Sequence, residues 1–209
     1  MPCVLQQLLY ISAVTAGNSP NDEELLNQIQ RAAFGYFLQA MDPVTGLVAD
    51  TSRANSPCSI AVVGFALSVL PIGVERGWMT RENAVAQCLL TLRFFHDSDQ
   101  SGTARSTGYK GLYFHFLDMR TGARVWQCEL SMIDTALLIA GVLTSAAYFN
   151  ADSRDEVELR RLADALACRV DWHWAHAGGE TINHGWKPES GFLNYCWDGY
   201  SEALVLYVL

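Results

Sequence analysis

Three segments of the chain carry the pattern of a helix with one apolar face and one polar face. Segment 21–41 repeats apolar residues at helical spacing behind an acidic first turn, which favours a helix start. Segment 81–96 has a polar outer face. Segment 154–175 follows Ser153, and Ser153 with Glu156 has the spacing of a capping box. We therefore predict three amphipathic helices.

Three further segments, 58–75, 131–148 and 201–209, are apolar nearly all round. Helices of that kind are buried on every side. Each follows an amphipathic segment and a loop, and this order repeats with a period of roughly seventy residues. Alternating outer and inner helices predict an all-α fold, an α/α toroid. The inner helices would begin on one face, and the long loops before them are where we expect a site.

A small β-hairpin interrupts the helical pattern before the second inner helix. Gly111–Leu117 is aromatic and strand-like, residues 118–122 contain turn-forming types, and Ala123–Gln127 is predicted to pair back as a short second strand. The hairpin would deliver two carboxylates, Glu129 and Asp134, to the start of a buried helix.

The two ends of the chain are distinct from its middle. Residues 1–17 faintly resemble a signal peptide but lack a positively charged start, and we set residues 1–20 apart as an N-terminal extension. Segment 201–209 has no C-terminal cap, no glycine stop and no polar close. Because three helical hairpins are too few to close a ring, we interpret residues 21–209 as the N-terminal half of a larger domain or a truncated product. Its exposed apolar edge predicts self-association.

Charge and composition exclude several classes of partner. The net charge is -8 over 209 residues, and no cluster of lysine and arginine occurs, which argues against nucleic acid and anionic membranes. No stretch is long and apolar enough to predict a membrane span. The scattered cysteines resemble small buried hydrophobes more than a disulfide framework or a zinc site, so the compartment stays open. These cysteines are Cys3, Cys58, Cys88, Cys128, Cys168 and Cys196.

Glu129 and Asp134 are the first candidates for chemistry. Five residues apart, they do not share a helix face closely, but Glu129 at the helix start could point into a cleft from the hairpin. Structural roles compete with this interpretation. Asp134 has capping-box-like spacing from Ser131, and Glu129 could form a salt bridge with Arg124 or Arg120.

Asp198 and Glu202 are the second candidates, one on either side of the start of the last inner helix. Because Glu202 precedes a wholly apolar segment, we expect it to be partly buried, and burial would raise its pKa as a general acid requires. The competing structural roles are capping, for Asp198 with Ser201, and a first-turn acid favoured by the helix dipole, for Glu202.

In a toroid, Glu129 or Asp134 would meet Glu202 across one cavity. Paired carboxylates beside aromatic rings are the parts of a glycoside hydrolase, in which one acid protonates the leaving oxygen and the other activates water or attacks carbon. Aromatic rings also fill ordinary cores, so this composition alone does not choose between the two uses. The nearby rings are Tyr113, Trp126, Trp186, Tyr195, Trp197 and Tyr200.

Histidines and cofactor motifs add little. His115 in the aromatic strand and His184 in a loop could hydrogen-bond sugar hydroxyls, although His115 could equally be a satisfied strand residue. His173 and His176 lack a third ligand, so we predict no metal site. The glycine-rich nucleotide motifs, the nucleophile elbow and the H-E-x-x-H motif do not occur, so no cofactor is expected.

Segment 111–149, GLYFHFLDMRTGARVWQCELSMIDTALLIAGVLTSAAYF, resembles the signature region of the glucoamylase-like domain. That family includes bacterial β-1,2-glucanases and the related domain of cyclic β-1,2-glucan synthases. Segments TGLVADTSRANSPCSIAVVGFAL and GFLNYCWDGYSEALVLYVL resemble the family as well. The resemblance extends over nearly all of the chain from about residue 22 onward.

This resemblance implies an (α/α)6 barrel of six helical hairpins, of which about three are present. It implies hydrolysis of a glucan, preferably of β-1,2-linked glucose, with inverting chemistry in the stand-alone glucanases. The positions that match the acidic cleft are Glu129, Asp134 and Glu202, together with Asp198. We expect Glu202 to be the general acid and Glu129 or Asp134 to be the base or to position water. The family also favours a periplasmic or secreted location.

A second hypothesis is a non-catalytic module that binds carbohydrate or serves as a scaffold, as a remnant of the same barrel. It predicts sugar binding through the Trp and Tyr loops without turnover, or association with another chain through the apolar edge.

Overall fold

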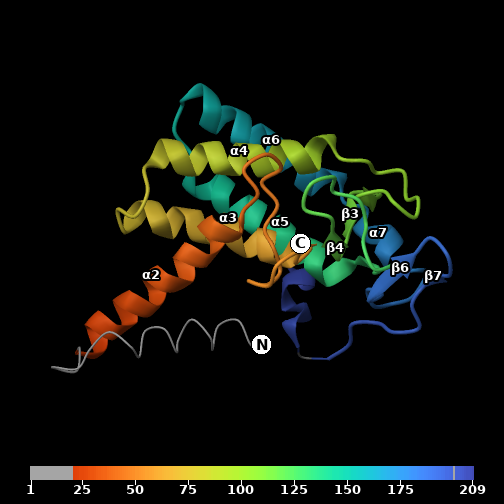
Figure 1. The fold of residues 1–209 in the computed structure, drawn as a ribbon. Coiled ribbons are helices and arrows are strands. Elements are labelled where there is room, and N and C mark those ends of the chain that lie inside the picture. The colour runs from red at the N-terminus through yellow and green to blue at the C-terminus, as the bar shows by residue number, and fades with distance from the viewer. Residues whose placement is uncertain (1–20, 200) are drawn as a thin grey trace.

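The computed structural model describes residues 21–199 and 201–209, so the predicted N-terminal extension and Tyr200 lie outside the described residues. The described chain is mostly helical, with two small sheets beside the helices (Figure 1). The helices are α2 (Asp22–Ala40), α3 (Ile60–Glu75), α4 (Arg81–Asp97), α5 (Met132–Tyr148), α6 (Arg154–Arg169), α7 (Trp172–Ala175) and the 3-10 helix η1 (Glu202–Tyr207).

The start of most predicted helices is confirmed by its cap. The side chains of Asn21, Thr80, Ser131 and Ser153 each accept a hydrogen bond from a backbone N–H in the first turn of α2, α4, α5 and α6. These bonds satisfy donors that a helix start leaves free. The alternation of amphipathic and apolar helices is therefore present as predicted from α2 to α6.

The inner helices α3 and α5 pack against each other, and the outer helices α4 and α6 form a second layer over them (Figure 1). Two glycines allow α3 and α5 to approach closely. A Cβ at Gly64 would lie 2.2 Å from the carbonyl oxygen of Leu137, and one at Gly141 would lie 2.1 Å from the carbonyl oxygen of Gly64. Any larger residue would force the helices apart, so this contact fixes how their N-termini lie relative to each other.

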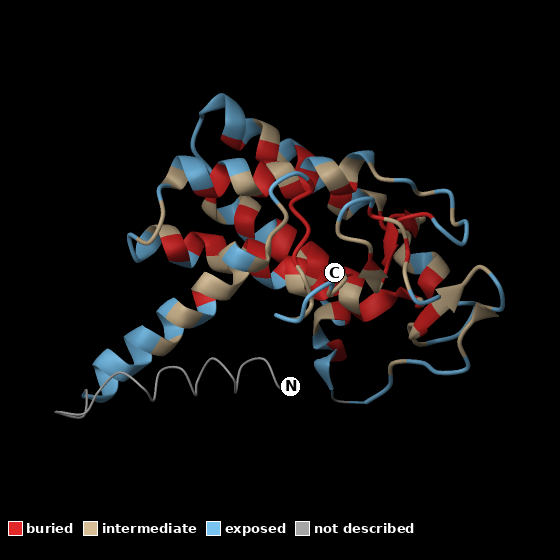
Figure 2. Cartoon of the chain, in the orientation of Figure 1, coloured by how far each residue is buried: buried red, intermediate tan, exposed pale blue. Residues whose placement is uncertain are grey.

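Burial follows the two layers (Figure 2). Buried residues are concentrated on α3, α5 and the facing sides of α4 and α6, whereas α2 projects from the body and is largely exposed at its N-terminal end. Phe34 is the buried residue of α2, and its ring lies 5.2 Å from that of Trp78. Helix α2 is therefore attached mainly through its C-terminal half.

The single helix predicted over 154–175 is wrong in its second half, because the chain breaks between α6 and α7. The Asp171 N–H donates to the carbonyl oxygen of Lys110, and the Lys110 ammonium lies 2.8 Å from the Asp171 carboxylate. Gly111 packs against this point, where a Cβ would lie 2.4 Å from the carbonyl oxygen of Arg169. Contacts with a distant strand therefore end the helix.

The described strands form more sheet than an all-α prediction allows. Strands β1 and β4 pair with each other, and the other five form an antiparallel sheet in the order β2-β3-β5-β6-β7. The pairing of β5 with β6 joins residues more than fifty positions apart, which local patterns do not reveal. The strands are β1 (Cys58–Ser59), β2 (Gly108–Tyr109), β3 (Leu112–Phe114), β4 (Phe116–Leu117), β5 (Leu130–Ser131), β6 (Gly185–Lys187) and β7 (Gly191–Phe192).

The predicted hairpin is therefore wrong in its second strand. Gly111–Leu117 does contain β3 and β4, but these strands belong to different sheets. The returning segment contributes one isolated bridge, Leu117 to Arg124, and a hydrogen bond from the Val125 N–H to the Phe116 carbonyl oxygen. The chain then turns at Trp126 and Gln127, which both have positive φ. After this turn it forms β5, and β5 is the strand that pairs with β3.

Two smaller expectations are corrected. The last inner helix, predicted over 201–209, is the short 3-10 helix η1, which packs on α5. Among the described cysteines, Cys58, Cys88 and Cys128 are buried as expected, whereas Cys168 and Cys196 are exposed. Within the part of the chain that the structure describes, none of the helices has the length and apolarity needed to cross a bilayer.

Candidate active site

The N-termini of α3 and α5 are joined by the residue between β3 and β4. The carbonyl oxygen of His115 accepts from the Ile60 N–H at the start of α3, at 3.2 Å. The N–H of His115 donates to the carbonyl oxygen of Glu129, just before β5 and α5, at 3.0 Å. The backbone of His115 is thereby held by both inner helices, at the face where the sequence predicts a site.

The His115 side chain gathers both predicted carboxylates. Its Nδ1 donates to Glu129 Oε1 at 2.9 Å and lies 3.6 Å from Asp134 Oδ2. The side chains of His115 and Glu129 are each 28% exposed, and that of Asp134 is 14% exposed. The cluster is thus partly shielded from water but still open to a ligand.

Asp134 also has the capping role considered from the sequence. The Ser131 hydroxyl donates to Asp134 Oδ2 at 2.5 Å and accepts from the Asp134 N–H at 3.3 Å. This part of the structural interpretation is confirmed, and it does not remove Asp134 from the cluster. The hydroxyl instead fixes the carboxylate on the side that faces His115.

The two carboxylates have opposite electrostatic environments. The hydrogen bond from His115 lowers the pKa of Glu129 despite partial burial. Burial raises the pKa of Asp134, and the charges of Glu129 and Asp50 add to that rise. Burial lowers the pKa of His115, but Glu129, Asp134 and Asp50 together raise it above its ordinary value. Glu129 is therefore held ionised, whereas Asp134 keeps a proton more readily.

The same three donor atoms lie within 4.8 Å of one another, close enough to share a cation, and an imidazole with carboxylates would suit a transition metal. However, the Nδ1 atom already donates to Glu129. Hydrogen bonding therefore accounts for the cluster, and we assign it as an ion pair with a second carboxylate. The rings of His173 in α7 and His176 at its C-terminal end lie 6.5 Å apart, and neither belongs to this group of donor atoms.

An aromatic path leads from the cluster to the surface. The Phe116 ring stacks on His115 with ring centroids 3.9 Å apart, and Trp126 lies 5.2 Å from Phe116. Trp126 is 70% exposed. Its φ of 56° and the φ of 50° at Gln127 place two successive non-glycine residues in the left-handed region. Strain of this kind is found mainly at functional sites, so Trp126 suits a predicted sugar-binding role.

Arg124 holds the loop that carries Trp126. The buried guanidinium donates to the carbonyl oxygen of Cys128 at 2.6 Å and to both carboxylate oxygens of Glu189 at 2.7 and 3.1 Å. The salt bridge of Glu129 with Arg124 considered from the sequence is therefore wrong. The partner of Arg124 comes from the β6–β7 turn instead.

Tyr113 does not reach the site. The residue is fully buried, its hydroxyl donates to the carbonyl oxygen of Phe95 at 3.2 Å, and Arg169 donates to the same hydroxyl. Burial raises the pKa of Tyr113 to about 12. The predicted sugar-binding role is wrong for this residue in the described structure, because its polar atom already has partners inside the core.

The aromatic residues of the loop before η1 divide into two groups. Trp186 is half-buried and stacks on Tyr109 at 5.4 Å, as part of the packing around the five-stranded sheet. Trp197 stacks on His184 at 4.2 Å, and Tyr195 lies 6.1 Å from the same imidazole with 69% exposure. The group around His184 is the one available to a ligand.

Asp198 and Glu202 are exposed, so the expected partial burial of Glu202 is wrong. The cap of η1 comes from the Ser201 hydroxyl, which accepts from the Ala203 N–H at 3.2 Å. No interaction recorded among the described residues joins Asp198 or Glu202 to the carboxylate cluster. Tyr200, another predicted site residue, lies outside the described residues.

The sequence interpretation missed Asp50 and Phe116. Asp50 lies in the loop before α3 and is close enough for its charge to act on both His115 and Asp134. A signal was present, since this loop precedes an inner helix and carries an acid. Phe116 lies in the aromatic strand pattern, but nothing in that pattern indicates that it stacks on His115.

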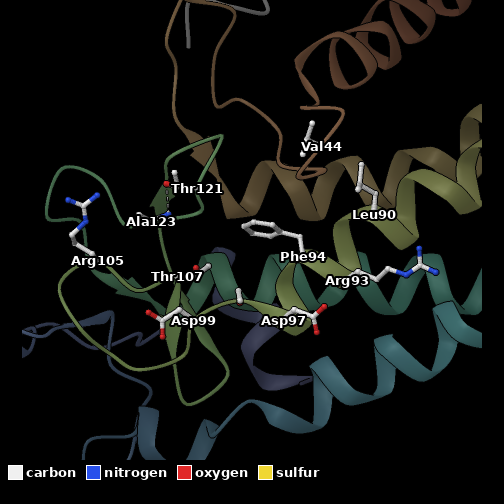
Figure 3. Close-up of a pocket in the computed structure, with 11 residues that line it drawn as sticks. Val44, Leu90, Arg93, Phe94, Asp97, Asp99, Arg105, Thr107, Thr121 and Ala123 are labelled. Atoms are coloured by element: carbon white, nitrogen blue, oxygen red, sulfur yellow. Dashed lines mark hydrogen bonds between the residues drawn. The ribbon is translucent and has the colours of Figure 1, made fainter.

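A separate hollow of about 550 Å³ lies beside the C-terminal end of α4 (Figure 3). Phe94 points into it between Val44 and the acids Asp97 and Asp99, with Thr107 and Thr121 on the opposite side (Figure 3). None of the residues that line it belongs to the carboxylate cluster. This hollow and the carboxylate cluster are therefore at different places.

No protein-family model matches the sequence. The chain is 27% identical over 197 residues to the exo β-1,2-glucooligosaccharide sophorohydrolase (non-reducing end) of Parabacteroides distasonis, an alignment that covers 90% of this chain and 26% of that protein. A solved β-1,2-glucanase of Parabacteroides distasonis superposes with a TM-score of 0.79 at 26% identity, over 92% of this chain and 28% of that one.

Two further structures show the same fold. A glucoamylase-like protein of Bacteroides uniformis has a TM-score of 0.83 at 24% identity. The endo-β-1,2-glucanase of Chitinophaga pinensis, in complex with sophorotriose and glucose, has a TM-score of 0.80 at 22% identity. Each match covers more than 90% of this chain and 47% of the other. The described chain is thus a mostly helical unit that matches about half of such barrels, and it spans between about a quarter and a half of the relatives' lengths.

Proposed function

This chain is a homologue, in sequence and structure, of the glucoamylase-like and β-1,2-glucanase proteins, and from that premise we propose that it acts in the hydrolysis of a β-1,2-linked glucan. The observation that supports this most is the carboxylate cluster at the start of α5. It holds Glu129 ionised by His115 and Asp134 in surroundings that raise its pKa. Glycoside hydrolysis requires one carboxyl group of each kind.

Asp134 is the better proton donor of the two, because Glu129 is the one that stays ionised. The sequence predicts Glu202 as the proton donor because it predicts burial of that side chain. Glu202 is exposed, so this reason does not apply. Glu129 and Asp134 have oxygens within 4.8 Å of each other, whereas an inverting pair needs about 6.5–9.5 Å to admit a water molecule. We therefore propose that Asp134 donates the proton and that Glu202, on the helix packed against α5, acts as the carboxylate on the other side of the sugar. Ionised Glu129 is needed as well, because it holds the charged His115 beside Asp134.

The substrate preference follows from the named activities of the relatives, which act on β-1,2-glucooligosaccharides and β-1,2-glucan. Exposed and partly exposed rings are suitable for stacking on the apolar faces of glucose units. Trp126 would bind on the side of Phe116, and Tyr195 with Trp197 would bind on the side of His184. Asp198 remains a predicted hydrogen-bonding partner for sugar hydroxyls.

The test is incubation of the purified chain with linear β-1,2-glucan, scored for new reducing ends. We expect release that falls about a thousandfold in Asp134→Asn, because that variant cannot donate a proton. Glu202→Gln should be similarly impaired. Glu180→Gln, an exposed acid in the same loop region, is the matched control and should keep full activity. Full activity in Asp134→Asn, or a folded wild-type chain that releases no sugar, would contradict the proposal.

A non-catalytic carbohydrate-binding module is the second candidate, because Trp126 and Tyr195 are exposed whether or not turnover occurs. Binding of sophorose-type oligosaccharides without release of sugar would favour it. Self-association is proposed as well, since α3 exposes Phe65 and Ile72 and α5 exposes Leu143. Sedimentation tests this point, because a stable monomer would exclude an interface at these residues.

A further inference from the structure

The ring of His115 is fixed before any ligand binds. Its backbone N–H and carbonyl oxygen are both hydrogen-bonded, to the segments that begin α5 and α3. One face of the imidazole is covered by Phe116 with an interplanar angle of 13°, and Nδ1 donates to Glu129. A residue held at four points is arranged to orient its neighbours. Its sequence-predicted role as a partner for sugar hydroxyls does not require such restraint.

We propose that His115 is a positioning residue: its imidazolium stands between Glu129 and Asp134, binds the first directly, and keeps the two carboxylates in different protonation states. This inference deepens the proposed function and rests on it. The geometry that supports it is the asymmetry of the two distances, 2.9 Å to Glu129 and 3.6 Å to Asp134. The closer carboxylate takes the hydrogen bond and stays ionised, whereas the farther one takes its hydrogen bond from Ser131.

The other titratable groups around the cluster do not supply this effect. Asp50, from the loop before α3, adds negative charge that acts on His115 and Asp134. Cys58 and Cys128 stay neutral thiols, because burial raises the pKa of both, to about 12 for Cys58. Lys187 acts on Glu129 from β6. His115 is thus the one cation that affects both carboxylates among the groups described here.

Removal of the imidazolium has a defined consequence. In His115→Gln, the pKa of Glu129 should rise because it loses a charged donor, and the pKa of Asp134 should also rise because it loses an attractive charge. If Glu129 must be ionised and Asp134 protonated for turnover, both limbs of the bell-shaped pH profile of kcat move to higher pH. We expect kcat at the wild-type optimum to fall on the order of tenfold to a hundredfold, with KM little changed.

The experiment measures kcat and KM across pH for the wild-type chain, His115→Gln and His173→Gln. His173 is an exposed imidazole on α7 and serves as the matched control, whose profile should stay in place. A raised KM with an unshifted profile in His115→Gln would overturn the proposal in favour of direct sugar binding. A loss of folded protein with an unshifted profile for the remainder would overturn it in favour of a structural role.

A second readout does not depend on turnover. Proton NMR of the imidazole C–H resonances, assigned with the two histidine variants, follows the titration of His115 directly. We expect His115 to titrate above an ordinary histidine and to shift downward in Glu129→Gln. A titration that is ordinary and insensitive to Glu129→Gln would refute the ion pair, even in a protein that hydrolyses glucan. A raised, sensitive titration in a chain that shows no hydrolysis would instead refute the proposed function alone.

Discussion

The ion pair of Arg81 with Glu156 and that of His115 with Glu129 are both partly buried, but they differ in their charge balance. Arg81 on α4 binds Glu156 on α6 through two hydrogen bonds of 2.8 Å, and Glu156 also accepts from the Ala151 N–H. In this pair, one guanidinium faces one carboxylate, so the two charges balance. At the start of α5, one imidazole faces Glu129 and Asp134, so negative charge is in excess. The balanced pair joins the outer helices α4 and α6. In the cluster with excess negative charge, the pKa of Asp134 is raised, so this carboxyl group keeps a proton more readily. The difference suggests that balance, more than burial, separates structure from chemistry here.

Breaking the balanced pair should have the largest effect on stability. Glu156→Ala would leave the Arg81 guanidinium and the Ala151 N–H without their shared partner. We expect the free energy of unfolding to fall by about 2–3 kcal/mol. This loss is no larger than the usual cost of breaking a fully buried ion pair, because the Arg81 side chain is partly exposed. Urea denaturation measures this loss.

Glu129→Gln is the comparison variant for that experiment and should cost much less stability. Activity per folded molecule should be retained in Glu156→Ala and lost in Glu129→Gln. The opposite pattern would remove the distinction between the two pairs.

The pH dependence of stability should separate the pairs with an intermediate effect. The pKa of Glu156 is lowered by Arg81, so its contribution is present above the ordinary carboxyl value of 4.5 and is lost as pH falls through the lowered value. The pKa of His115 is raised, so its contribution is complete below 6.5 and is lost as pH rises through the raised value.

Unfolding free energies across pH test this directly. His115→Gln should be destabilised by about 1 kcal/mol in mildly acidic buffer and by almost nothing in alkaline buffer. Glu156→Gln should show its full cost at neutral pH and a smaller one in strong acid. Parallel curves for the two variants would show that the pairs do not differ in this way.

The smallest effect is expected at the exposed end of the aromatic path. Trp126→Ala should weaken oligosaccharide binding by about fivefold to tenfold, which corresponds to roughly 1 kcal/mol of stacking, and should leave stability nearly unchanged. Calorimetric titration with a β-1,2-glucooligosaccharide measures it. Ile72→Ala, an exposed apolar residue on α3, is the control. Equal losses in both variants would mean that Trp126 has no specific role.

Most helices could be predicted because their signals are local. Ser131 and Ser153 cap α5 and α6 by accepting from a backbone N–H three residues further on, and the apolar pattern of α3 and α5 follows from the burial of most of their residues. The break between α6 and α7 could not be predicted, since the partner of Asp171 is Lys110, sixty-one positions earlier.

The candidate site was predicted in part for the same reason. Glu129 and Asp134 could be found because they flank the start of an apolar helix. The burial assumed for Glu202 was wrong, because the chain forms a short 3-10 helix there that leaves the carboxylate exposed. Tyr113 was misassigned, since an aromatic strand pattern does not tell which rings the second layer covers.

The sequence by itself determined most of the helical segments from α2 to α6, where most of them begin, and which face would gather the loops, because caps and apolar periodicity act over a few residues. Only the tertiary structure decided that His115 binds Glu129, that Asp50 acts on the same cluster, and that Arg124 holds the Trp126 loop through Glu189. These contacts join residues 14 to 65 positions apart. Such pairings depend on how the layers pack, and packing is a property of the whole chain that no local pattern contains.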